Sequence, residues 1–177
     1  WRLTKVSCAK NNVNTFTYMR RKKELAKKKI QEVVSEFAQY LKDNGVKHFS
    51  PETDPKLFAH EPPKELWPNI IKTLQILDKV REDYGKPITI NSAYRSPEYN
   101  KKVGGATHSL HMENCAIDFS IDADLPTLFA DLKRGKYLVD GVTADDLGVG
   151  YYFVKHFIHL DTRGLIGREA PSYWKKS

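Results

Sequence analysis

The chain has 177 residues, 40% of them hydrophobic and 11% aromatic, which excludes an intrinsically disordered protein and suffices for one domain with a hydrophobic core. Its formal net charge of +7 favours an anionic partner, such as nucleic acid, acidic lipid headgroups or a cell wall rich in carboxylates and phosphates. No apolar run is long enough to span a bilayer, and no signal-peptide core is present. The two cysteines form no CxxC pair, which argues against a cysteine zinc site and a disulfide framework.

Helical spacing dominates the N-terminal part of the chain. Apolar residues recur at helical intervals over residues 17–42, and an Asp-Asn-Gly sequence follows as a stop, which predicts a long amphipathic helix. We expect residues 1–47 to form a helical extension packed on a core domain of residues 48–177. Basic residues over 20–29 are interleaved with acidic and apolar ones, a pattern more typical of a solvated helix face than of a binding patch.

The rest of the chain alternates between helix and strand patterns. A proline-rich stretch predicts a loop over residues 48–63, and an apolar face predicts a second, buried helix over residues 63–85. Strands are predicted over residues 87–95 and 114–121 and in a hairpin over residues 148–162, with a short helix over residues 125–133. These elements predict an α+β fold in which a small central antiparallel sheet carries the site and is packed by helices.

Two polar residues fall on strand faces opposite core positions. Asp118 points away from the apolar residues of its strand, and His159 points away from Ile158 and Leu160 in the second arm of the hairpin. Zinc is an economical partner for such residues, because imidazole and carboxylate are its usual nitrogen and oxygen ligands. His111 lies seven residues before Asp118, a gap that lets a turn bring both to one ion. Spacing alone does not distinguish such a site from ordinary hydrogen-bonded histidines.

Two segments together resemble a known family. The segments SAYRSPEYNKKVGGATHSLHMENCAID and GVGYYFVKHFIHLDTRG resemble the zinc peptidases of the D-alanyl-D-alanine carboxypeptidase and L-alanyl-D-glutamate endopeptidase superfamily. Members of that superfamily cut peptidoglycan stem peptides and share a fold with the amino-terminal hedgehog domain. The family patterns SGYRS, SxHxxGxAxD and HxD are met in chain order by Tyr94 and Arg95, by Ser109, His111, Ala116 and Asp118, and by His159 and Asp161. The resemblance covers residues 63–164.

The resemblance implies a zinc site with a defined set of ligands. His111, Asp118 and His159 would hold Zn²⁺, which lowers the pKa of a bound water to about 7. Arg95 would stabilise the oxyanion that develops on the scissile carbonyl, or else form an ordinary salt bridge to a nearby acid. Tyr94 and Ser109 would bind substrate, although the Ser109 hydroxyl equally suits a turn.

The chain departs from the family pattern at two positions. Asn114 replaces a glycine, which is tolerable because asparagine can adopt a left-handed backbone. Many members carry Glu or Asp three residues before the last histidine ligand, and His156 stands there in this chain. Histidine has a suitable pKa for a general base, but the strand phase places His156 opposite His159 unless a turn or bulge intervenes. Asp161 is the alternative base, or a residue that orients His159.

These features predict a zinc metallopeptidase that hydrolyses an amide bond in peptidoglycan stem peptides or cross-links, as a D,D- or L,D-type carboxypeptidase or endopeptidase. We expect Zn²⁺ as cofactor, peptidoglycan as substrate, no nucleic-acid partner, no membrane span and a monomer. Such hydrolysis takes place outside the cytoplasm or during phage lysis or entry, so we expect a periplasmic or secreted, cell-wall location, or a phage lysis or tail protein. The start at Trp1 instead of Met suggests a processed product from which an export signal has been removed. The alternatives are a non-catalytic zinc-containing wall-binding module, which His156 in place of an acid would suit, and a nucleic-acid or surface binder that uses residues 20–29.

Overall fold

The structure is a computed structural model that describes residues 9–177 and, within them, all side chains but those of residues 9–16, 26 and 29–35. The chain divides into two units, Trp1–Glu36 and Phe37–Ser177. Among the described residues, no helix combines the length and the apolar character needed to cross a membrane. The boundary predicted between residues 47 and 48 stays a prediction.

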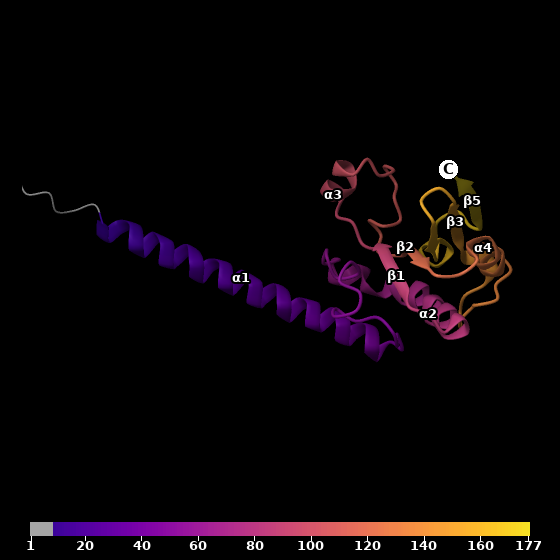
Figure 1. Ribbon diagram of the computed structural model, residues 1–177, viewed down its shortest axis with the longest axis horizontal. Helices are drawn as coiled ribbons and strands as arrows, with labels where there is room; N and C mark the ends of the chain where they lie inside the picture. The colour runs from indigo at the N-terminus through magenta and orange to yellow at the C-terminus, as the bar shows by residue number, and fades with distance from the viewer. Residues whose placement is uncertain (1–8) are drawn as a thin grey trace, which may run out of the picture. The chain divides into compact units, whose positions relative to one another are not determined.

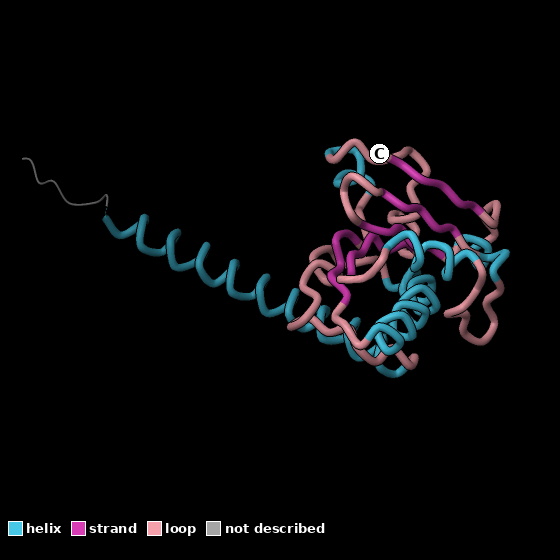
Figure 2. The backbone as a smooth tube through the Cα atoms, turned by 45° about the vertical axis from the view of Figure 1, so that its right-hand side comes forward, coloured by secondary structure: helices cyan, strands magenta, loops and turns pink. Residues whose placement is uncertain are grey.

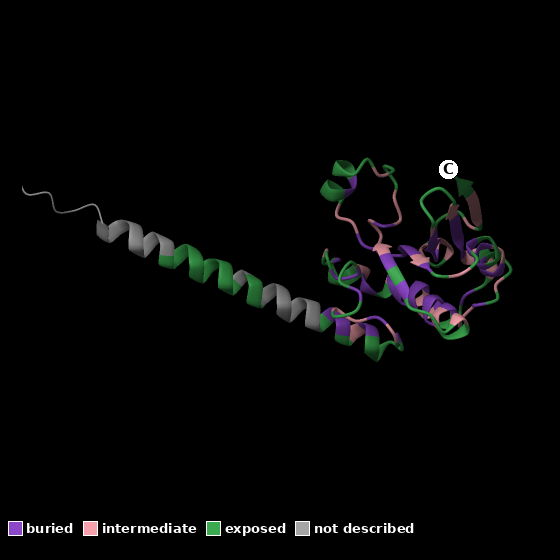
Figure 3. Cartoon of the chain, in the orientation of Figure 1, coloured by how far each residue is buried: buried purple, intermediate pink, exposed green. Residues whose placement is uncertain are grey.

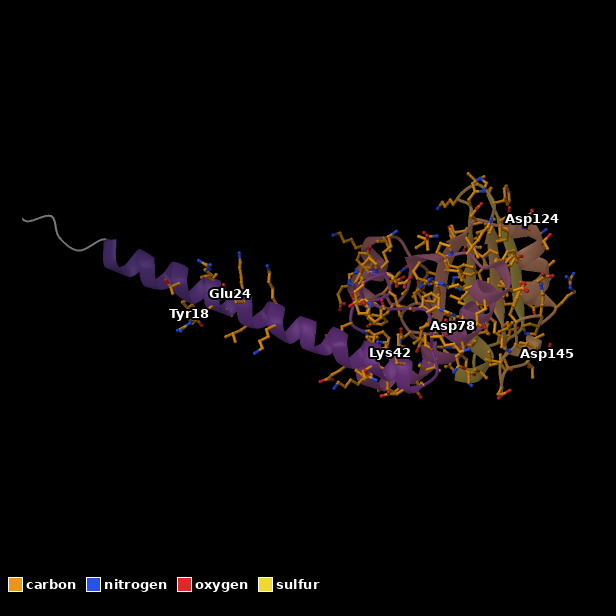
Figure 4. The ribbon with its side chains drawn as sticks, turned by 60° about the horizontal axis from the view of Figure 1, so that its bottom comes forward. Tyr18, Glu24, Lys42, Asp78, Asp124 and Asp145 are labelled. Atoms are coloured by element: carbon orange, nitrogen blue, oxygen red, sulfur yellow. The ribbon has the colours of Figure 1, made fainter. Side chains whose placement is uncertain are left out.

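Helix α1 (Ala9–Asp43) contains the helix predicted over residues 17–42 (Figure 1). Its described side chains in the first unit are exposed, among them Tyr18 at 64% and Leu25 at 68% (Figure 4), and the described basic residues of the 20–29 run are exposed as well. Phe37 and Leu41, which belong to the second unit, are buried. The remaining apolar positions of the predicted face lie outside the described side chains, so an amphipathic face along the whole helix stays a prediction.

The buried helix predicted after the proline-rich loop is α2 (Trp67–Tyr84), preceded by the short helix η1 (Lys64–Leu66). It ends at Gly85, whose φ of 61° is a left-handed conformation that suits glycine. Asp78 on this helix holds the start of the loop, because its carboxylate accepts hydrogen bonds from the backbone N–H groups of Lys47 and His48 at 2.8 and 3.1 Å. The loop is therefore fixed to α2.

The second unit contains a five-stranded sheet (Figure 2). Its strands are β1 (Ile88–Ser92), β2 (Ala116–Ile121), β3 (Gly148–Tyr152), β4 (Phe157–Asp161) and β5 (Ser172–Lys176), in the order β1-β2-β4-β3-β5. The first four strands pair antiparallel, as predicted, but β5 pairs parallel to β3. The prediction of a purely antiparallel sheet is therefore wrong, because the chain after β4 passes through η3 (Arg163–Ile166) and returns to add an edge strand in the direction of β3.

The two faces of the sheet differ in character. Ile117 and Phe119 of β2 and Ile158 and Leu160 of β4 are fully buried on one face (Figure 3). Helix α2 contacts β2, and α4 (Leu125–Lys133) contacts β3 and β4. A short helix, α3 (Pro97–Lys102), and the turn η2 (Ala144–Asp146) complete the unit.

The opposite face carries polar and aromatic residues in one row across the sheet. The strand registers place Ser92 beside Asp118, Asp118 beside His159, His159 beside Gly150, and Gly150 beside Trp174. Cross-strand neighbours of this kind lie about 4.5–5.5 Å apart, close enough for their side chains to interact. The row brings together residues from all five strands.

Candidate metal centre

The three residues expected to bind metal converge at the centre of this row. One ligand atom each from His111, Asp118 and His159 lies within 4.8 Å of the others, and all three residues are buried. Asp118 and His159 come from the neighbouring strands β2 and β4, and His111 comes from the turn that precedes β2. The structure therefore brings the three predicted ligands together.

His111 presents a nitrogen that suits a cation. Its Nδ1 lies 2.7 Å from the carbonyl oxygen of Ala93 and donates to it, while burial lowers the pKa of the ring and favours the neutral form. Nε2 is then a bare lone pair, and it lies 3.3 Å from Oδ2 of Asp118. Two acceptors that face each other at this distance repel unless a cation lies between them, so the donor set fits a metal ion.

His159 is oriented from behind by a second carboxylate. Its Nε2 lies 2.9 Å from Oδ2 of Asp161, and its Nδ1 lies 2.8 Å from Oδ1 of Asp118. Burial opposes a charge on the ring, but the two carboxylates outweigh it and raise the pKa of His159 to about 9 in the metal-free protein. Asp161 thus faces the back of the ring, away from the other two ligands.

Arg163 holds Asp161 in this position, a role that the sequence analysis missed. Its Nε and Nη2 donate to the two oxygens of Asp161 at 2.9 and 2.7 Å, and Asp161 itself is fully buried. Burial raises the pKa of an aspartate, but the bonds from Arg163 and His159 hold that of Asp161 at about 2. Gly148 leaves room for this pair, because a Cβ there would lie 2.4 Å from both Arg163 Nε and Asp161 Oδ2.

Trp174 covers the site from β5 and was also missed. Its ring lies 5.3 Å from that of His159 and 5.4 Å from the guanidinium of Arg163, measured to ring centroids. Gly150 makes this approach feasible, since a Cβ there would lie 2.4 Å from the Trp174 ring. The two glycines of the Gly-Val-Gly sequence at the start of β3 were the signal for this close packing.

Arg95 lies where the SAYRS box placed it, at the edge of the cluster. Its Nη2 donates to Oδ2 of Asp118 at 2.9 Å, and its Nε donates to Ser92 Oγ at 2.8 Å. The backbone N–H of Arg95 also donates to the carbonyl oxygen of His111 at 3.1 Å, which ties the two motifs together. Arg95 therefore forms an ion pair with Asp118, one of the expected metal ligands.

A cavity of about 740 Å³ opens onto the cluster and is lined by both predicted and unpredicted residues. Arg95, Ser109 and the three expected ligands line it, together with His108, Glu169 and Trp174. Tyr94 and Asp161 are buried and lie outside the lining.

His156 also lies outside the cavity lining. It is exposed in the loop between β3 and β4 and adopts a φ of 50°. Its carbonyl oxygen accepts a hydrogen bond from Ser120 Oγ at 2.8 Å. The structure therefore does not bring the expected base to the cluster.

Asn114 has the left-handed backbone that its replacement of glycine required, with a φ of 51°. Its Nδ2 donates to the carbonyl oxygen of Leu66 at 3.0 Å, so the side chain also links the turn before β2 to the start of α2. The substitution is thus accommodated without disturbing the turn that carries His111.

Comparisons with known proteins match this region. The Peptidase M15 family matches residues 39–161. The chain is 36% identical over 107 residues to the zinc D-Ala-D-Ala carboxypeptidase of Streptomyces albus G, an alignment that covers 59% of this chain. The chain spans only 39% of the length of that relative.

Proposed function

Because the chain belongs to the Peptidase M15 family and its cofactor is Zn²⁺, we propose that it hydrolyses an amide bond in peptidoglycan stem peptides or cross-links. The observation that carries the proposal is the convergence of His111, Asp118 and His159 beside an open cavity. Three protein ligands from these residue types are typical of catalytic zinc sites, whereas structural sites use four. Carboxypeptidase and endopeptidase activity both fit this arrangement.

The residues proposed to hold zinc are His111 through Nε2, His159 through Nδ1 and Asp118 through its carboxylate. When bound, the ion supplies Lewis-acid chemistry toward the carbonyl oxygen of the substrate. The choice of nitrogens follows from the hydrogen bonds to Ala93 and Asp161, which occupy the other nitrogen of each ring.

Arg95 is proposed to stabilise negative charge on that oxygen. Ser92 fixes its Nε, so the guanidinium is aimed at the cavity side of the cluster with little freedom to rotate. Preorganised donors of this kind act mainly on the charge that develops in the transition state. Ser109 and Tyr94 remain proposed substrate contacts, of which Ser109 lines the cavity.

We assign Asp161 the role of orienting His159 rather than that of base. Both of its oxygens accept hydrogen bonds from Arg163, and one also accepts from His159, so it is unsuited to receive a proton from a water in the cavity. His156 would reach the cavity only through a rearrangement of the β3–β4 loop. Its position outside the cavity is the observation that favours the alternative, a zinc-containing wall-binding module without catalysis.

The site of action follows from the substrate. Peptidoglycan lies outside the cytoplasm, so the proposal places the protein in the periplasm or among secreted proteins. The +7 formal charge suits an anionic wall. That residues 1–47 form an extension of the peptidase domain is part of this proposal.

Digestion of purified peptidoglycan and soluble muropeptides, followed by mass spectrometry, tests the function. We expect the zinc-loaded protein to release peptide products, the chelated protein to release none, and added zinc to restore activity. His156→Ala, assayed beside the unaltered protein, tests the base. If the zinc-loaded protein binds the wall but cuts no muropeptide, the binding-module alternative is correct.

A further inference from the structure

The cavity that opens onto the metal cluster is rich in cationic side chains. Five cationic residues line it, namely Arg95, Lys155, Arg163, Arg168 and Lys176. The three arginines are neutralised by ion pairs to Asp118 at 2.9 Å, to Asp161 at 2.7 Å and to Glu113 at 2.6 Å, respectively. Within the described part of the chain, Lys155 and Lys176 have no carboxylate within ion-pair distance.

The two lysines belong to the same end of the sheet. Lys176 is beside Tyr152 in the register of β5 and β3, and its carbonyl oxygen accepts a hydrogen bond from the backbone N–H of Phe153 at 3.1 Å. That bond ties the end of β5 to the β3–β4 loop, which carries Lys155. Both side chains line the cavity from this end.

Their distance from the cluster is set by the strand. Trp174 and Lys176 are two residues apart and therefore point to the same face of β5. Trp174 is in the row of His159, so Lys176 lies about 7 Å farther along the strand direction; because β3 separates β4 from β5, it also lies about 10 Å across the sheet from His159, or about 12 Å away in all. An extended peptide spans about 3.3–3.6 Å per residue, so the separation corresponds to about three to four substrate residues.

Unpaired ammonium groups at one end of a cavity favour an anion. Glu169 is the carboxylate that lines the cavity outside the metal cluster, and among the described residues it forms no ion pair with either lysine. A carboxylate that accepted from both ammonium groups would relieve their mutual repulsion and form charge-assisted hydrogen bonds.

We propose that Lys155 and Lys176 bind a carboxylate of the substrate and thereby select peptides that carry one within about four residues of the scissile bond. The inference rests on the proposed function, because it places the scissile bond at the metal cluster. The carboxylate belongs either to the C-terminus of a stem peptide or to an acidic side chain within it. Both offer the same chemistry, and the experiment separates them.

The test uses one stem peptide in three forms: the free acid, the C-terminal amide and the form whose side-chain carboxylates are amidated. Each is titrated into the zinc-loaded protein at low temperature, with mass spectrometry to verify that the peptide stays intact, and kcat/KM is measured wherever cleavage occurs. The variants are Lys155→Met, Lys176→Met and the control Lys175→Met. Lys175 points to the opposite face, where its ammonium lies 5.5 Å from the Phe129 ring, so the control removes the same charge from the neighbouring position.

We expect Lys155→Met and Lys176→Met each to weaken binding of the free acid by roughly 3- to 10-fold, and Lys175→Met to change it less than twofold. One of the two amidated peptides should bind the unaltered protein as weakly as the free acid binds the two lysine variants. The position of the amide in that peptide then identifies which carboxylate the lysines bind. Equal binding of all three peptides by the unaltered protein, no binding of any, or equal effects of Lys175→Met and Lys176→Met would each overturn the proposal. Selective binding without cleavage of any peptide would instead refute the proposed function and leave the carboxylate site standing.

Discussion

Nε2 of His159 lies 2.9 Å from Oδ2 of Asp161, on the side of the ring that faces away from the other proposed ligands. The carboxylate is fully buried and held by Arg163, so the orientation of the imidazole does not depend on a bound metal. Because the imidazole of His159 is already held in position, metal binding requires less rearrangement of this ligand.

The first prediction concerns the ligands themselves. His111→Ala or His159→Ala should abolish zinc retention, because each removes one of three donors from the buried cluster. Elemental analysis after dialysis provides the measurement. His108→Ala is the matched control, since His108 lines the same cavity but is exposed and lies outside the cluster. A full zinc content in either ligand variant would show that the metal lies elsewhere.

Asp161→Asn should weaken zinc binding by about 10- to 100-fold, the usual loss when the partner of a ligating histidine is removed. The asparagine oxygen can still accept a hydrogen bond from His159, but the side chain has no negative charge to stabilise the imidazole. Competition with a chromogenic chelator measures the affinity. Asp145→Asn, an exchange at an exposed position of η2, is the control. An unchanged affinity in Asp161→Asn would mean that Asp161 serves only the fold.

Zinc binding should release a proton near neutrality. In the metal-free protein the pKa of His159 is raised to about 9, so at pH 7 its ring is charged and zinc must displace the proton on Nδ1. The apparent affinity should therefore rise with pH, by roughly tenfold per unit, until the pH reaches that pKa. Calorimetry in buffers of different ionisation enthalpy counts the protons. Zinc uptake at pH 7 with no proton release would contradict the charged state of His159.

Arg95→Ala should fold, keep zinc and lose about 100- to 1000-fold in kcat, as the loss of one oxyanion donor typically does. Its ion pair with Asp118 makes a zinc measurement on the variant essential, because a loss of metal would mimic a loss of catalysis. Rates within a few-fold of the unaltered protein, at full zinc content, would assign Arg95 a structural role.

Gly150→Ala should lower the free energy of unfolding by about 1–3 kcal/mol, a typical cost of overpacking. The added Cβ would lie 2.4 Å from the Trp174 ring. Denaturant titration gives the value. In a Trp174→Ala background the same exchange should cost much less, and a double-mutant cycle reports the difference. Additive effects of the two substitutions would mean that the ring and the glycine do not compete for space.

Much of the fold could be predicted from hydrophobic periodicity. The predicted second helix, the strands that became β1 and β2, the hairpin of β3 and β4, and the helix over residues 125–133 are all confirmed. Strand phase also placed Asp118 and His159 on one face, and their register as direct neighbours follows from the pairing of β2 with β4. The family membership inferred from the motifs is confirmed as well.

What could not be predicted depends on contacts between distant segments. Strand β5 shows no alternation of apolar and polar residues, so its pairing with β3 is invisible in the sequence. Trp174 and Arg163 reach the site only through that pairing and through η3. The orientation of His156, three residues before the proposed ligand His159, likewise depends on the local geometry of the hairpin loop. His156 adopts a left-handed conformation in that loop, which strand periodicity does not predict.

The row from Ser92 to Trp174 contains one residue from each strand, and Trp174 comes from the last of the five strands in chain order. All three proposed ligands are made before β5, yet the wall that covers His159 exists only after β5 has paired with β3. A nascent chain that stops short of residue 174 would carry the ligands in a half-open sheet. We therefore expect stable loading with metal to follow the docking of β5 onto β3.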